Sequence, residues 1–309
     1  MSLQTAQAIQ HLQTEGYRVT PPLELVEQNG CLPTLNPTIK VAILDTETTG
    51  LDQTADRIIE LGILVAEIDR CTGKLVQIID RMDALEDPGI PIPANSSAVN
   101  GITNTMVAGH HIDDEQVKAL IENVELVIAH NAGFDRPFIE SRIPAFSEKA
   151  WACSLKDIDW HAAGISSGKL EYLAYFFGFH FNAHRALVDC RALLQVLNQT
   201  LPGFEHTAML ALLNKARSAS VRLIVNENPF GTKDALKNRG YRWNSDAYYW
   251  AKIIPTELLS EEAAWLHTSI FAGESMEIET ELLDAYNRYS NRPGVRSTLS
   301  LGNGLIAQL

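Results

Sequence analysis

The segment Val41-Ala42-Ile43-Leu44-Asp45-Thr46-Glu47-Thr48-Thr49-Gly50 decides how the rest of the chain is interpreted. Its leading apolar residues predict a buried strand that ends in two acids. Because strand side chains alternate between faces, Asp45 and Glu47 project to the same side. Two adjacent carboxylates repel one another and lose hydration unless a cation lies between them. The segment therefore predicts a metal site, although an isolated Asp-x-Glu would also suit an ordinary turn cap.

Two further segments carry acids, one where a strand gives way to a helix and the other in a helix that follows a loop. His130-Asn131-Ala132-Gly133-Phe134-Asp135 follows a predicted strand, and His184-Arg185-Ala186-Leu187-Val188-Asp189 places a histidine five residues before an acid. Asp135 alone would serve as a helix cap, and a lone His184 would usually be structural. In company with Asp45 and Glu47, these acids offer the oxygen ligands that hard divalent cations prefer.

The three segments, in this order, resemble the motifs of the DEDDh (DnaQ-like) 3′-5′ exonucleases, the family that contains the proofreading exonuclease of bacterial DNA polymerase III. Asp45 and Glu47 stand in the first motif, Asp135 in the second, and His184 and Asp189 in the third, with the family's His-x4-Asp spacing. The resemblance implies a ribonuclease H-like exonuclease fold and a phosphodiester hydrolase activity.

The same resemblance implies a reaction that uses two divalent metal ions, Mg²⁺ or Mn²⁺. Asp45 is expected to bridge both ions, Glu47 and Asp189 to support the ion that carries the attacking water, and Asp135 to act mainly at the other. His184 is expected to take a proton from that water. The product would be a nucleoside 5′-monophosphate.

Several positions near the motifs match those with which the family contacts the terminal nucleotide. They are Thr46, Thr48, Leu51, Asn131 and Phe134. Asn100 stands where relatives often have the histidine of a His-Gly-Ile-Thr sequence, and it is still expected to hydrogen-bond a terminal sugar. Ordinary turn and core packing is an equally suitable explanation for these residues.

The pattern around the motifs predicts an α/β fold with a mixed five-stranded sheet and helices on both faces. Strands expected at 57–68 and 75–81 form an antiparallel meander with the first strand. Short strands expected at 125–129 and 150–155 then alternate with helices at 113–123, 133–143, 170–177 and 186–197. The exonuclease domain is thereby assigned to residues 38–201. Residues 1–37 are expected to form a helical lead-in that packs on the core through Leu3, Ala6, Ile9 and Leu12.

A small α+β module is expected after the exonuclease domain. We assign residues 202–218 to a linker helix, 219–273 to the module, and 274–309 to an acidic helix and a flexible tail. From Lys215 to Lys252, eight basic residues accompany three acids, a local balance of +5 in a chain of net charge −13. Interleaved with Trp243 and Trp250, these basic residues suit a platform for single-stranded nucleic acid, although the module's own core would use the same aromatics.

The composition, 46% hydrophobic and 20% charged, is typical of a soluble globular protein. The apolar stretches are shorter than the roughly 20 residues that cross a bilayer, so neither a membrane span nor a membrane partner is expected. Residues 1–16 lack the basic start and apolar run of a secretory signal. The cysteines are widely spaced, which predicts reduced thiols in a cytoplasmic protein. They are Cys31, Cys71, Cys153 and Cys190.

These observations predict a metal-dependent enzyme that trims single-stranded 3′ ends, with DNA as the expected substrate and a replication or repair protein as a candidate partner. Two alternatives stay open. One is the same chemistry on RNA, because the sequence does not distinguish the two sugars. The other is a catalytically silent subunit that binds nucleic acid, against which the complete set of acids argues.

Overall fold

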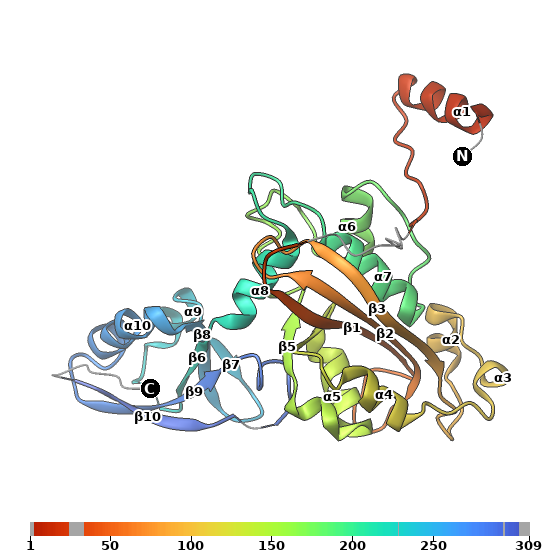
Figure 1. The fold of residues 1–309 in the computed structure, drawn as a ribbon. Coiled ribbons are helices and arrows are strands. Elements are labelled where there is room, and N and C mark those ends of the chain that lie inside the picture. The colour runs from red at the N-terminus through yellow and green to blue at the C-terminus, as the bar shows by residue number, and fades with distance from the viewer. Residues whose placement is uncertain (1–2, 25–33, 228, 293, 303–309) are drawn as a thin grey trace. The chain divides into compact units, whose positions relative to one another are not determined.

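The computed structural model describes residues 3–24, 34–227, 229–292 and 294–302. Cys31 lies outside these residues. The chain divides into two compact units, Met1–Leu213 and Asn214–Leu309, and helix α8 (Ala208–Arg217) crosses the boundary between them. Each unit has its own sheet (Figure 1).

The first unit contains a five-stranded mixed sheet in the order β3-β2-β1-β4-β5, as the sequence predicts. Strands β1, β2 and β3 form an antiparallel meander. Strand β4 runs parallel to β1, and β5 runs parallel to β4. The strands are β1 (Thr38–Thr48), β2 (Ile58–Asp69), β3 (Leu75–Leu85), β4 (Leu126–Ala129) and β5 (Ala150–Cys153).

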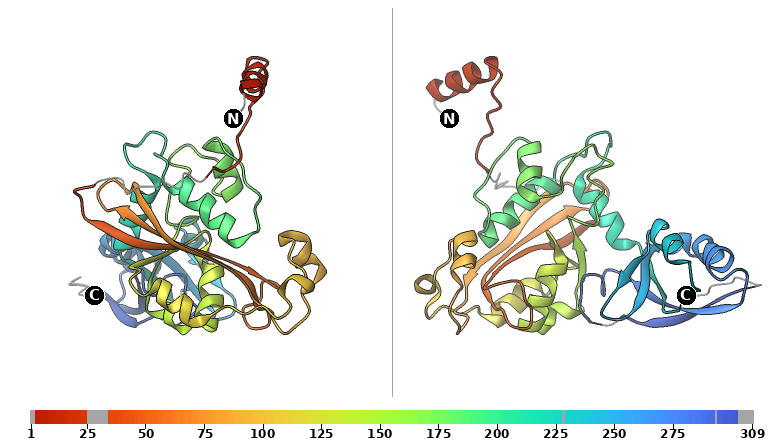
Figure 2. Two further views of the ribbon diagram at one scale, coloured as in Figure 1. Left: turned by 45° about the vertical axis from the view of Figure 1, so that its right-hand side comes forward. Right: turned by 180° about the vertical axis from the view of Figure 1, so that it is seen from behind.

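Helices cover both faces of this sheet, which explains why the four residues from Val41 to Leu44 are all fully buried. Helices α6 (Leu170–Phe176) and α7 (Ala186–Leu197) lie over one face, and α4 (Asp114–Ile121) and α5 (Ala132–Arg142) over the other (Figure 2). Helix α7 has the bounds expected from its apolar periodicity.

Short helices complete the first unit. Helices α2 (Ala94–Asn100) and α3 (Asn104–Val107) lie beside the start of β2, and the 3₁₀ turn Pro144–Glu148 follows α5. Ile92, Ile102 and Val107 form a small cluster with Ile59 of β2. This cluster flanks helix α2, which ends at Asn100.

Gly62 allows α7 to approach β2 closely. A Cβ atom added to Gly62 would lie 2.4 Å from both the carbonyl carbon of Ala186 and the backbone nitrogen of Leu187. Any side chain at this position would therefore displace the first turn of α7, which carries Asp189.

The prediction that the helix of the lead-in packs on the core is wrong. Helix α1 (Leu3–Thr14) forms as expected, but none of its residues is buried. Leu3 is 77% exposed and Leu12 is 40% exposed. A stripe of two leucines, one isoleucine and one alanine offers little apolar area to bury.

The second unit is an antiparallel sheet in the order β10-β9-β6-β8-β7, with one face covered by helices. Its strands are β6 (Ser220–Val225), β7 (Arg242–Asn244), β8 (Tyr249–Pro255), β9 (Met276–Leu283) and β10 (Arg296–Leu301). Its helical segments are α9 (Lys233–Asn238), the 3₁₀ turn Thr256–Leu258, α10 (Leu259–Trp265) and the π-helical turn Leu266–Ile270.

The prediction of an acidic helix and a flexible tail for residues 274–309 is wrong where the chain forms strands β9 and β10. Along β9, Ile278 and Thr280 are buried toward the core, whereas Glu279 and Glu281 alternate with them and form ion pairs with Arg296 and Arg222 of neighbouring strands. Because the acids find basic partners across the sheet, the segment has a period of two rather than a helical period. Residues 303–309 lie outside the described part of the chain.

None of the helices in the described ranges is both long enough and apolar enough to cross a membrane. Of the cysteines that the structure describes, Cys71 is exposed, and Cys153 and Cys190 are buried as free thiols.

We predict that Gly62→Ala lowers the free energy of unfolding by about 1–3 kcal/mol, because the added methyl group overpacks the contact with α7. Urea denaturation of the full chain would measure this change. Gly133→Ala is the matched control, since its added Cβ would come no closer than 3.6 Å to Lys156 Nζ. A Gly62→Ala protein as stable as the parent would contradict the close approach.

Candidate active site

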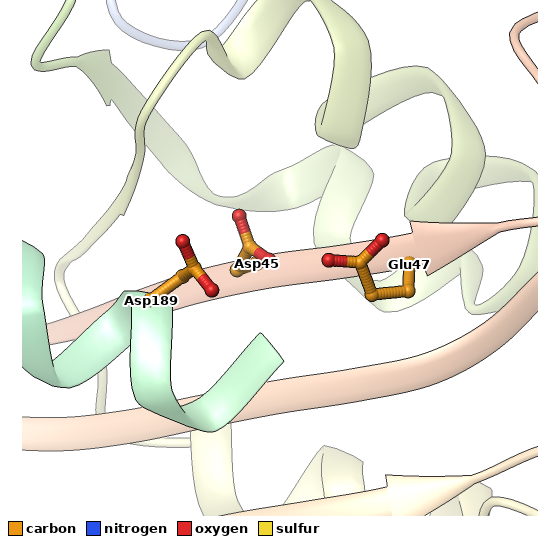
Figure 3. A group of neighbouring side chains, drawn as sticks. All are labelled: Asp45, Glu47 and Asp189. Atoms are coloured by element: carbon orange, nitrogen blue, oxygen red, sulfur yellow. The ribbon is translucent and has the colours of Figure 1, made fainter. Parts of the chain in front are cut away.

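Three carboxylates converge where β1 ends beside the first turn of α7. One oxygen atom from each of Asp45, Glu47 and Asp189 lies within 4.8 Å of the other two. Figure 3 shows the side chains from β1 and α7 facing a common space. All three side chains are half-buried. The strand alternation therefore has the predicted result for Asp45 and Glu47, and α7 adds the third acid.

Asp135 lies beside this group in the first turn of α5 and lines the same cavity. Its Oδ1 atom accepts hydrogen bonds from the backbone N–H of Thr46 at 3.0 Å and from the Thr46 hydroxyl at 2.9 Å. Thr46 thus orients Asp135 toward the end of β1. Asp135 is not a member of the closest group, so the structure brings together three of the four predicted ligands and places the fourth next to them.

The pKa values of these acids are raised because the groups are buried among like charges. The pKa of Asp45 is raised well above its usual range, first by burial and then by Asp135, Asp189 and Glu47. Burial and Asp189 raise the pKa of Glu47 to about 7, although a hydrogen bond from Asn100 opposes this shift. The site therefore holds protons near neutral pH, where ordinary carboxylates hold almost none.

Asp135 and Asp189 show the same effect. Burial raises the pKa of Asp135 to about 7 against the hydrogen bonds from Thr46. Burial raises the pKa of Asp189 to about 6 against the backbone N–H of Arg185 and the charge of His184. Divalent cations would replace the retained protons and offset the repulsion. Since every donor is a carboxylate oxygen, the chemistry of the set suits Mg²⁺ or Mn²⁺.

The acids open into a cavity of about 340 Å³. His184 lines it from the connection between α6 and α7, as predicted, and adopts a left-handed backbone conformation with φ of 69°. Phe134 also lines the cavity and packs against Phe138 at a centroid distance of 5.1 Å. All five predicted catalytic residues therefore border one space.

The predicted nucleotide contacts are only partly brought to this cavity. Thr46 and Phe134 line it, whereas Thr48, Leu51, Asn100 and Asn131 do not. The Thr48 hydroxyl donates to the Gly50 carbonyl oxygen, and Leu51 is 83% exposed.

Asn100 and Asn131 have local roles in this part of the structure. Asn100 is buried and hydrogen-bonds Glu47, and its Oδ1 atom accepts from the backbone N–H of Ile102 at 2.9 Å. Asn131 has φ of 77° and precedes α5. Asn100 therefore contacts a metal-binding candidate, and its contact with a terminal sugar stays a prediction.

Sequence reasoning missed the anchor of α7, which is formed by Glu60 and Arg185. Glu60 lies opposite Glu47 in the β1–β2 ladder and is buried. Its Oε1 atom accepts from Nε and Nη2 of Arg185 at 2.9 and 2.6 Å, and its Oε2 atom accepts from the Ala186 backbone N–H at 2.9 Å. The anchor fixes the helix start between His184 and Asp189. The sequence feature that could have indicated this anchor is Glu60, an acid inside the apolar run of β2.

Lys169, Glu171 and His130 also line the cavity without having been predicted to do so. Lys169 brings an ammonium group to a wall that is otherwise rich in acids. Burial lowers the pKa of His130 to about 4, and its Nδ1 atom lies 2.8 Å from the Ser154 hydroxyl. His130 is therefore neutral at ordinary pH and packs as part of the wall.

Three of the eight basic residues in the patch predicted for the C-terminal module form ion pairs within the second unit. Arg222 pairs with Glu281, while Arg239 and Lys252 both pair with Glu262. These acids lie outside the stretch from which the local balance of +5 was counted.

The aromatic residues of the module divide between its core and its surface. Trp250 is buried in the core of the second unit, whereas Trp243 is 47% exposed and Tyr248 is 73% exposed. The nucleic-acid platform stays a prediction, with two exposed aromatic residues and with three of its eight basic residues paired to acids.

Comparisons with known proteins agree with this geometry. Residues 42–197 match the RNase_T family model, which is described as an exonuclease. The chain is 29% identical over 192 residues to DNA polymerase III subunit epsilon of Treponema pallidum, covering 59% of this chain and 86% of that subunit. It is 30% identical over 169 residues to the PolC-type DNA polymerase III of Thermotoga petrophila, covering 50% of this chain and 11% of the polymerase. The chain thus matches about a tenth of that relative's length.

Among solved structures, a zinc-bound complex of E. coli ExoI with ssDNA aligns with a TM-score of 0.50. The identity is 16%, and the alignment covers 70% of this chain and 63% of that chain. This similarity shows a shared fold.

We predict that Asp45→Asn stabilises the metal-free protein at pH 8, raising Tm by about 2–4 °C, which corresponds to about 1 kcal/mol. The folded protein keeps protons on these acids that the unfolded chain releases above about pH 4, so metal-free stability falls as pH rises from about 4 toward 8. The Tm difference should shrink at pH 5, where these acids are protonated. Differential scanning calorimetry in the presence of a chelator measures it.

Added Mn²⁺ should raise the Tm of the parent by mass action and leave that of Asp45→Asn nearly unchanged. Asp80→Asn, at an exposed acid on β3, is the matched control and should respond to the metal like the parent. Equal metal responses of the parent and Asp45→Asn would refute the assignment.

Proposed function

Because the chain belongs to the exonuclease family whose model matches its residues 42–197, we propose that it is a 3′-5′ exonuclease that releases nucleoside 5′-monophosphates from single-stranded DNA. The observation that carries this proposal is the convergence of Asp45, Glu47 and Asp189 at a cavity that His184 also borders. Acids whose pKa values are raised by burial are typical of catalytic sites, and a subunit that only binds nucleic acid does not require them.

The acids supply the ligand set for two divalent cations. Asp45 is the central ligand, Glu47 and Asp189 act with it on one side, and Asp135 acts on the other, where Thr46 orients it. When bound, the cations neutralise charge at the scissile phosphate and lower the pKa of a bound water. The protein contributes the fixed positions of the oxygens, because β1 and α7 are both packed into the core.

His184 acts as the general base in this proposal. It borders the same cavity as the acids, and a neutral imidazole there can accept the proton of the attacking water. Phe134 offers an apolar ring to the terminal base, and Lys169 offers an ammonium to a substrate phosphate. The cavity thus provides partners for a base, a phosphate and a proton.

The choice of DNA over RNA rests on the relatives, both of which are DNA polymerase III proteins by name. The same names support a replication protein as a partner. A repair protein as the partner and a cytoplasmic location are further parts of the proposal.

The proposal is tested with matched single-stranded DNA and RNA oligonucleotides labelled at the 5′ end, with Mg²⁺ present. We expect a descending ladder on DNA and slower cleavage of RNA. His184→Asn should lower kcat by about 10²–10⁴-fold, because the general base is lost, and His161→Asn, at an exposed histidine, is its control.

The pattern of products separates the alternatives. Faster cleavage of RNA would replace the DNA proposal with an exoribonuclease. Absence of cleavage on both sugars, with Mn²⁺ binding intact, would contradict the proposed activity of the chain on single strands.

A further inference from the structure

The N-terminal segment of residues 18–23 is bound to the connection that carries His184. Arg18 Nη2 donates to the backbone carbonyl oxygens of Tyr175 at 2.6 Å and Phe176 at 2.9 Å. Its guanidinium also lies 4.2 Å from the centroid of the Tyr175 ring. A cation that satisfies the last carbonyls of a helix stabilises the helix end, so Arg18 secures the C-terminus of α6.

A second contact lies farther along the same connection. The Leu23 backbone N–H donates to the His180 carbonyl oxygen at 2.7 Å, and the His180 N–H donates to the Pro21 carbonyl oxygen at 3.0 Å. These bonds form a parallel bridge between Pro22 and His180. The imidazole Nδ1 of His180 lies 3.0 Å from the Thr20 carbonyl oxygen. The segment therefore holds the connection at its start and at its middle.

The end of this connection next to α7 borders the catalytic cavity, where Ala183 and His184 line it. Lys169 and Glu171 line the same cavity from the start of α6, the helix that leads into the connection. On the α7 side, Glu60 anchors Arg185. The left-handed backbone of His184 is a conformation that persists only when its surroundings hold it. The restraint on the other side comes from the N-terminal segment.

We propose that residues 18–23 form a brace that holds the α6–α7 connection and so places His184 over the carboxylates, with Arg18 as its main positioning residue. The brace rests on the proposed function, since it gives His184 its place in the reaction. The proposed brace divides the lead-in of residues 1–37 into two parts. Residues 18–23 bind the exonuclease unit, whereas α1 buries none of its residues and contributes nothing to the site.

Arg18→Ala tests the brace in the full-length protein. We expect kcat on single-stranded DNA to fall about tenfold, because small displacements of a catalytic group reduce the rate strongly. KM and the affinity for Mn²⁺ should stay within about twofold of the parent, since the carboxylates keep their anchors. Arg18→Lys keeps the charge and part of the hydrogen bonding, so it should recover part of the rate.

Arg70→Ala is the matched control. Arg70 Nε also donates to a backbone carbonyl oxygen, that of Thr38 at 2.7 Å, and its side chain pairs with Glu125, but it does not touch the α6–α7 connection. Hydrogen exchange followed by mass spectrometry supplies a readout that does not depend on activity. Amides of residues 177–184 should exchange faster in Arg18→Ala and at the parent rate in Arg70→Ala.

The outcomes distinguish the brace from the proposed function. An active parent with an unchanged kcat in Arg18→Ala, or unchanged exchange at residues 177–184, would overturn the brace and leave the exonuclease standing. Equal losses of kcat in Arg18→Ala and Arg70→Ala would also overturn it, because they would show a general effect on stability. If the parent itself degraded no oligonucleotide, the proposed function would fail, and the exchange at residues 177–184 alone would decide whether the segment holds the connection.

Discussion

Mutual repulsion among buried carboxylates is the constraint on which the exonuclease unit depends. Oxygen atoms of Asp45, Glu47 and Asp189 lie within 4.8 Å of one another, and Asp135 adds a further acid to the same cavity. In water such groups would separate and ionise independently. Here they are carried by elements that are packed into the core on both faces of a sheet, so they cannot separate. The arrangement costs stability until cations neutralise it, as is common for functional sites.

Two contacts hold α7 in place against this repulsion, and both come from β2. Gly62 lets the backbone of α7 approach the strand, and Glu60 binds Arg185 and the first free N–H of the helix. Since β2 is also the antiparallel neighbour of β1, one strand fixes both sources of acids relative to each other. For the connection before α7, the proposed brace from the N-terminal segment supplies the corresponding restraint.

The parts of the site that the sequence predicted are those that follow local rules. A period of two places Asp45 and Glu47 on one face, the junction of β4 with α5 places Asp135 near the same sheet edge, and the apolar periodicity of α7 predicts the helix that carries Asp189. Contacts between distant segments follow no such rule. Glu60 and Arg185 are separated by 125 positions, and Arg18 and Tyr175 by 157. The error in the C-terminal tail has the same origin, because the acids of β9 pair with basic residues on β6 and β10, far away in the sequence.

The distribution of charge shows how an acidic protein can accommodate a phosphate backbone. Of the 25 basic and 38 acidic residues, eleven of each lie in residues 214–309, so the whole excess of −13 lies in residues 1–213. The unit that carries the catalytic cavity is therefore the one that repels nucleic acid at long range. Binding of a strand end must then draw on bound cations and on local groups such as Lys169 and Phe134 rather than on a broad field of lysine and arginine. Because few counterions are released when few basic side chains meet phosphates, the affinity of the proposed enzyme for DNA should depend more on divalent metal than on monovalent salt.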